Sequence, residues 1–196
     1  MPAISESRDA ILDQLKSSEE TAAKLIAGLS HAQMNWQPND GRSWSIWQCL
    51  DHLARTNRAY CQSMLEAIAH PGRHSKATQA IAPGWFGRLF VAKMEPSART
   101  KYKTVKKVTP GTEGDAGAAM RDFLDSHAEA RRVVASWEEV EFNRVRFQNP
   151  FVPVLRFTVG TGLMIINAHD RRHLRQAERV KESSGYPAAS GTFEET

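Results

Sequence analysis

Apolar residues recur at helical spacing through four long stretches of this 196-residue chain, and that pattern restricts the possible folds more than any other feature. Side chains three and four residues apart lie on one face of a helix, so each stretch can bury a single apolar stripe. The four stretches cover residues 5–29, 45–69, 115–140 and 159–184. Four helices of about 25 residues, each with one such stripe, predict an all-α protein built as a four-helix bundle.

The connections between these stretches are unequal in length. Residues 30–44 are rich in turn-forming residues, and Ser45 with Gln48 forms a capping-box pattern at the start of the second stretch. The long connections follow the second and third helices, at 70–114 and 141–158, and they permit crossover topologies. Within the first of them only Trp85–Met94 has a helical pattern. We expect one domain over 1–184, with 70–114 as an inter-helix insertion, and a flexible tail over 185–196.

The composition restricts the class of protein and the cellular compartment that we expect. Hydrophobic residues make up 41% of the chain and charged residues 24%, as in globular proteins, and no apolar run approaches the roughly 20 residues of a membrane span. Cys49 and Cys61 lie on one predicted helix about 18 Å apart, too far to form a disulfide. Without a signal-peptide pattern at the N-terminus, these features predict a cytoplasmic protein. The net charge of +4 is mild. A basic run at 99–107 leaves nucleic-acid binding as an unfavoured alternative, because no recognition motif accompanies it.

A pair of histidines stands out in the last predicted helix. His169 and His173 are four residues apart, so both rings point to one side, and they share an arc with apolar residues such as Ile166 and Ala177. Buried polar rings need partners, and a metal ion can be one. The metalloprotease motif His-Glu-x-x-His has a glutamate where this chain has Asp170, which disfavours that class. From the pair alone, both metal binding and an ordinary surface or core pair stay open.

A third ligand has to come from elsewhere among the seven histidines. His31, His70 and His74 lie in or beside predicted loops, where we expect exposure to solvent. His127 lies among polar residues of the third helix, and we expect it on a solvent-facing side. His52 lies at the edge of the apolar arc of the second helix. That position suits a pocket that opens toward solvent as well as an ordinary surface histidine.

Several motifs together resemble the DinB-like superfamily. They are Trp36-Gln-Pro, Trp44-Ser45, His52-Leu53 and His169-Asp-Arg-Arg-His173-Leu-Arg-Gln176, in an order that extends from the first helix to Val180. The resemblance implies an up-down-down-up four-helix bundle of the DinB and YfiT type. It also implies one divalent ion, nickel or zinc, bound by His52, His169 and His173, and frequent homodimers. Known members include transferases and isomerases that use thiols such as bacillithiol or mycothiol, while others are described as hydrolases. The 70–114 insertion departs from a minimal member, so a relative's substrate does not carry over.

Three protein ligands with an open fourth position are typical of a catalytic site. That position can hold water, for hydrolysis, or a low-molecular-weight thiol cosubstrate, for transfer to a small-molecule substrate. The resemblance favours the thiol route. Neither Cys49 nor Cys61 is expected to be the nucleophile, because both fit the apolar stripe. A metal-dependent hydrolase is one alternative, and a metal-binding stress-response or interaction protein without turnover is another.

Other polar residues near the three histidines have no assigned catalytic role. Asp51 and Asp170 each neighbour a histidine in sequence but turn about 100° away, so we expect them at the surface or behind the ligands. Gln176 can hydrogen-bond a ligand or substrate, or simply fill the core. Arg172 can hold an anionic substrate group or form a salt bridge within its helix. Four aromatic residues can line a pocket or belong to the core: Trp44, Trp47, Trp85 and Phe86.

Overall fold

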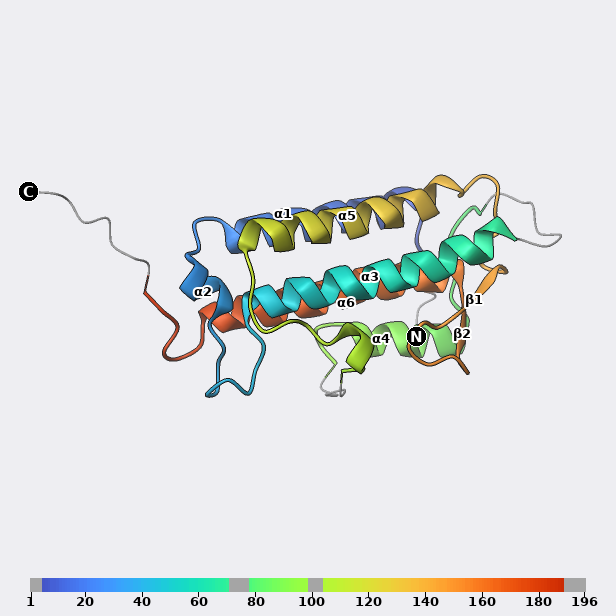
Figure 1. Ribbon diagram of the computed structural model, residues 1–196. Coiled ribbons are helices and arrows are strands. Elements are labelled where there is room, and N and C mark those ends of the chain that lie inside the picture. The colour runs from blue at the N-terminus through green and yellow to red at the C-terminus, as the bar shows by residue number, and fades with distance from the viewer. Residues whose placement is uncertain (1–4, 71–77, 99–103, 189–196) are drawn as a thin grey trace, which may run out of the picture.

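Four long helices lie side by side in the computed structural model, which describes residues 5–70, 78–98 and 104–188 (Figure 1). They are α1 (Arg8–Ile26), α3 (Ile46–Ala69), α5 (Ala116–Ala135) and α6 (Val159–Lys181). In Figure 1, α1 and α6 run in one direction, and α3 and α5 run in the other. The order along the chain is therefore up-down-down-up. The predicted all-α four-helix bundle is confirmed.

The helices begin where the sequence offers a side chain to cap them. Ser45 accepts a hydrogen bond from the backbone N–H of Gln48, and the Gln48 side chain accepts one from the Ser45 N–H. This is the predicted capping box, and it satisfies two N–H groups that the first turn leaves unpaired. Ser7, Asp115 and Thr158 cap the other three long helices in the same position.

Four short elements in the described connections were not predicted from the sequence, and one of them is the 3-10 helix η1 (Lys106–Val108) in the insertion. The turn-rich stretch 30–44 contains a short helix, α2 (His31–Asn35). The stretch 141–158 is not wholly irregular, because β1 (Arg146–Gln148) and β2 (Arg156–Thr158) pair in antiparallel register with Phe147 opposite Phe157. Both phenylalanines are buried and their strand neighbours are more exposed, an alternation too short to predict a strand. The predicted helical piece Trp85–Met94 is α4, with those bounds.

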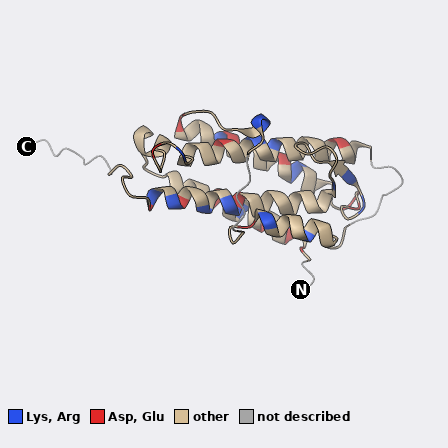
Figure 2. Ribbon diagram, turned by 90° about the horizontal axis from the view of Figure 1, so that it is seen from below, with Lys and Arg blue, Asp and Glu red and all other residues tan. Residues whose placement is uncertain are grey.

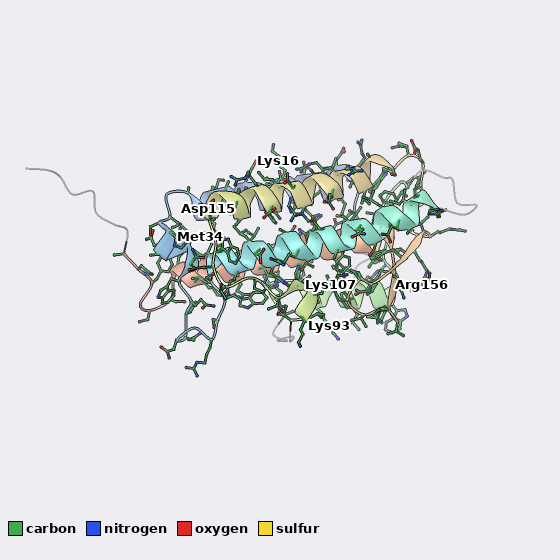
Figure 3. The ribbon with its side chains drawn as sticks, in the orientation of Figure 1. Lys16, Met34, Lys93, Lys107, Asp115 and Arg156 are labelled. Carbon is green, nitrogen blue, oxygen red and sulfur yellow. The ribbon has the colours of Figure 1, made fainter. Side chains whose placement is uncertain are left out.

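The four long helices form a ring in which α1 contacts α5, α5 contacts α3, α3 contacts α6 and α6 contacts α1. Outside this ring, α4 packs against α6, and η1 (Lys106–Val108) packs against α3. The two elements lie on the same side of the bundle, where Lys93 of α4 and Lys107 of η1 point outward (Figure 3). The insertion therefore covers the side of the bundle formed by α3 and α6.

Close packing at the start of α6 depends on a glycine. A Cβ atom at Gly162 would lie 2.5 Å from the sulfur of Met64 and 2.8 Å from a ring carbon of Phe147. Only a residue without a side chain lets α6 approach α3 and β1 this closely. This approach brings the middle of α6 against α3.

The surface and the chain ends add three observations. Within the described residues, no helix has both the length and the apolar character needed to cross a membrane. Seen from the α4 side, basic and acidic residues are both scattered along the helices (Figure 2). Tyr186 packs edge-on against Trp36, and Gln33 donates to the carbonyl of Pro187, so residues 186 and 187 of the expected tail contact the segment around α2. Residues 189–196 of the expected tail lie outside the described residues.

Candidate metal centre

The three histidines named as ligands by the family resemblance meet between α3 and α6. His169 and His173 stand four residues apart on α6, so both rings point toward α3. The Nε2 atom of His52, on α3, lies 3.4 Å from Nε2 of His169. One ring nitrogen from each residue lies within 4.8 Å of the other two. Two antiparallel helices thus bring three nitrogen donors together.

His52 is oriented by the long connection. Its Nδ1 lies 2.7 Å from the carbonyl oxygen of Val108, at the end of η1. Because a carbonyl can only accept, the proton is on Nδ1, and the neutral ring keeps its lone pair on Nε2, the nitrogen nearest His169. A backbone carbonyl behind a histidine is a common way to fix a metal ligand. His52 is 5% exposed, so it is not an ordinary surface histidine.

The connection that supplies Val108 is itself attached to the first half of α3. The Gly111 N–H donates to Asp51 at 3.0 Å, and the Gln48 side chain donates to the Gly111 carbonyl at 3.0 Å. A Cβ atom at Gly114 would collide with the indole of Trp47, so that ring lies directly against the connection. Asp51 also accepts from Arg55. Asp51 and Trp47 therefore hold the segment that orients His52.

The three rings are neutral at physiological pH because they are buried together. Burial lowers the pKa of His52, although the Val108 carbonyl and Asp51 act in the opposite direction. Burial and the charges of His52 and Arg172 lower the pKa of His173 to about 3. Burial, followed by the charges of His173, His52 and Arg172, holds the pKa of His169 well below its ordinary range. Neutral imidazole is the form that binds a metal, so the folded chain keeps the donors ready.

The donor set fits a divalent ion. The Nδ1 atoms of His169 and His173 are buried and find no hydrogen-bond partner among the described residues. The Nε2 atom of His169 faces the unprotonated Nε2 of His52 instead, and a metal ion held between the rings would bind such lone pairs. Three imidazoles without a carboxylate suit zinc or nickel better than magnesium or calcium. Among the described residues, this is the one group of three or more histidines, cysteines and acids close enough to hold an ion.

Trp44 forms one wall of the cluster. Its ring is stacked on His173 with centroids 5.6 Å apart and tilted against His52 at 4.8 Å. It is half-buried, so part of the indole is open to solvent beside the histidines. Of the four aromatic residues proposed for a pocket, Trp44 thus contacts the cluster. Trp85 and Phe86 make their ring contacts with each other and with Phe157, and Trp85 is 79% exposed.

Gln176 and Arg172 have different surroundings from each other. Gln176 is half-buried, and its hydrogen bonding to His173 raises the pKa of that ring against the effect of burial. Arg172 donates to the carbonyls of Lys93, Glu95 and Ala98, just where α4 ends. These carbonyls lie in the last turn of α4 and just beyond it, so Arg172 attaches the end of α4 to α6. Its charge still lies close enough to lower the pKa of His169 and His173.

His127 was predicted on a solvent-facing side of its helix, and this prediction was wrong. Its side chain is fully buried; Nε2 donates to Asp170 and Nδ1 to Glu19, each at 3.0 Å. Asp170 was expected at the surface or behind the ligands, and it is fully buried behind them. His127 lies four residues after Phe123 and three before Ala130, so it belongs to the same buried stripe of the helix. Its polar neighbours in the sequence hid this position.

The pKa of His127 gives a test of this buried contact. Burial lowers that pKa, but Asp170 and Glu19 outweigh burial and raise it from 6.5 to about 9. A raised folded pKa contributes stability that is complete below about pH 6.5 and is lost as the pH rises through about 9. The difference corresponds to on the order of 3 kcal/mol. Nitrogen NMR of the ring should show His127 titrating at this raised pKa. Urea unfolding at about pH 6 and about pH 10 should show the loss of stability between the two.

The His127→Gln variant is the control, since its unfolding should lack this component of the pH dependence. A His127 that titrates near its ordinary pKa would contradict the buried ion pair.

The remaining candidates lie away from the cluster or outside the described residues. His31 and His70 are exposed, as expected, and His74 lies outside the described residues. Residues 99–103 of the basic run also lie outside the described residues. The structure therefore adds nothing in favour of nucleic-acid binding, which stays an unfavoured alternative. Cys49 and Cys61 are buried and unpaired with each other, in agreement with their assignment to the core.

Fold and site together define a class: an up-down-down-up helical bundle with three histidines from two helices facing one another. Comparison with known proteins identifies the family. The sequence model of the DinB superfamily matches residues 14–177, so the chain belongs to this superfamily. Protein YuaE of Bacillus subtilis strain 168, named as uncharacterized, is 27% identical over 158 residues, covering 80% of this chain and 88% of YuaE.

A solved structure shares the fold. YfiT from Bacillus subtilis superposes with a TM-score of 0.55 and 16% identity, over 95% of this chain and 94% of YfiT. YfiT is described as a probable metal-dependent hydrolase with an unusual four-helix bundle topology. At this identity the likeness shows the fold alone.

Proposed function

We propose that this protein binds one divalent metal ion, nickel or zinc, through His52, His169 and His173, and uses it to activate a nucleophile toward a small-molecule substrate. The observation that carries the proposal is the meeting of three buried, neutral imidazoles, two of which have a ring nitrogen without a hydrogen-bond partner among the described residues. Membership of the DinB superfamily and the description of YfiT agree with it. A homodimer in the cytoplasm belongs to the same proposal.

The chain's own residues prepare the site for this role. The Val108 carbonyl holds the proton of His52 on Nδ1, which leaves Nε2 to bind. The half-buried indole of Trp44 covers the rings on one side and offers an apolar surface to a substrate. When bound, the ion would supply a Lewis acid that lowers the pKa of a thiol or water at its open position.

A small thiol is the first candidate for the nucleophile. Both neighbouring carboxylates already accept hydrogen bonds, Asp51 from Arg55 and Gly111, and Asp170 from Asn57 and His127. Neither is placed to act as a general base. A thiol has a much lower pKa than water and needs less help to lose its proton. The thiol must be external, because burial raises the pKa of both Cys49 and Cys61. Water is the second candidate, favoured by the description of YfiT.

An activity screen separates these candidates. We expect metal-loaded protein to consume electrophilic substrates only when a low-molecular-weight thiol is present, because neither Asp51 nor Asp170 is placed to act as a general base for water. His169→Ala should abolish the reaction, and Cys49→Ser should retain it, since that sulfur is buried away from solvent. Product formation is followed by mass spectrometry.

Hydrolysis of esters or amides without any thiol would favour water as the nucleophile. Metal binding without turnover under either condition would favour a non-catalytic metal-binding protein. Turnover that survives His169→Ala would contradict both catalytic routes.

A further inference from the structure

A chain of buried polar contacts connects all four long helices behind the metal centre. Asp170 of α6 accepts from the Asn57 amide of α3 and from the His127 ring of α5, each at 3.0 Å. His127 in turn donates to Glu19 of α1, and Glu19 accepts two hydrogen bonds from Arg131 at 2.6 and 2.8 Å. We call these five residues the polar network.

The network is too deeply buried to be a surface ion pair. Asn57, His127 and Asp170 are all fully inaccessible to solvent. The raised pKa of His127 means that a charged ring lies between two carboxylates inside the bundle. Burying charges costs free energy even when they are paired. Apolar residues in the same positions often give a core that is equally stable or more stable. A buried network of this kind is better suited to fixing the relative placement of helices than to adding stability.

The network involves the same two helices that carry the metal ligands. Asp170 directly follows His169 on α6, and Asn57 lies five residues after His52 on α3. One residue turns a helix by about 100°, and five residues turn it by about 140° beyond a full turn. The hydrogen bond between Asn57 and Asp170 therefore constrains how α3 and α6 are rotated relative to each other. That rotation decides whether His52 and His169 face one another.

We propose that Asp170 is a positioning residue, which through Asn57 and His127 fixes the rotation of α3 and α6 so that the three histidines converge. This inference rests on the proposed metal-binding function. The residue acts through the ligands and does not contact the ion or the substrate. Its effect is on the geometry and affinity of the site.

The test measures cobalt(II) binding to the full-length protein and to variants at a temperature where each is folded. Partners behind metal ligands typically change affinity roughly 10- to 100-fold, and we expect losses in that range for Asn57→Ala and Asp170→Asn. The visible absorption bands of bound cobalt should shift as well, because the coordination geometry changes. The exchange variant Asn57→Asp/Asp170→Asn restores an amide-to-carboxylate hydrogen bond between the two helices. It should recover much of the affinity and the original spectrum.

Val133→Ala is the matched control, since it removes apolar volume from the core of α5 without touching the network. It should lower stability and leave cobalt affinity and spectrum unchanged. Wild-type affinity and spectrum in both network variants would overturn the inference and leave metal binding intact. Failure of the wild-type protein to bind cobalt would instead overturn the proposed function. In that case, NMR contacts between the rings of His52 and His169 decide: their loss in the variants supports positioning, and their retention refutes it.

Discussion

Removing the metal from loaded protein is expected to lower the melting temperature by about 10 °C. An ion that binds only the folded chain adds about 4 kcal/mol when free metal is about a thousand times Kd, and each kcal/mol corresponds to about 2–4 °C at this size. The ligands belong to the neighbouring helices α3 and α6, which meet only in the folded chain, so the unfolded chain does not offer the ion this site. Calorimetry before and after chelation, on protein with verified metal content, gives the measurement.

The His52→Ala variant is the control for this experiment. It lacks the ligand from α3, so added metal should no longer join the two helices and chelation should have little effect. A wild-type melting temperature that does not respond to chelation would be incompatible with an ion bound between α3 and α6.

Asp170→Ala is expected to destabilise the metal-free protein by about 3–5 kcal/mol, the usual cost of removing one partner from a buried charge pair. The substitution leaves the His127 ring and the Asn57 amide without their acceptor in a fully buried position. Urea unfolding near neutral pH measures the change. Arg175→Ala, on the exposed side of the same helix, removes a surface ion pair with Glu178 and should change the stability little.

The double variant Asp170→Ala/His127→Leu distinguishes the pair from simple loss of volume. Removing both charged partners should cost clearly less than the two single substitutions added together, because neither charge is left unpaired. Strict additivity would show that Asp170 and His127 do not interact as the structure indicates.

Much of the fold was predictable because it depends on local patterns. Apolar spacing located the four long helices, and the Ser45 and Gln48 pair marked the beginning of α3. The spacing of His169 and His173 gave their shared direction on α6. Residue patterns alone left the third histidine undecided, and the family resemblance pointed to His52, whose ring the structure places beside the other two.

Other features depend on contacts between segments that are distant in sequence. The Val108 carbonyl reaches His52 across 56 residues, and Asp170 reaches His127 across 43. A carbonyl has no signature in the sequence, and the charged neighbours of His127 outweighed its place in the apolar stripe. The strand pair was missed because three residues are too few for an alternation to be recognised.

The most direct test of the metal centre is elemental analysis of untagged wild-type protein and of the single variants His52→Ala, His169→Ala and His173→Ala. We expect roughly one nickel or zinc ion per wild-type chain and a large loss in each variant, since a three-ligand site does not tolerate the removal of one donor. His31→Ala serves as a histidine control outside the cluster, because His31 is exposed, and it should retain metal. Full occupancy in His52→Ala would show that the third ligand is not His52, and wild-type protein without any divalent ion after metal loading would contradict the site altogether.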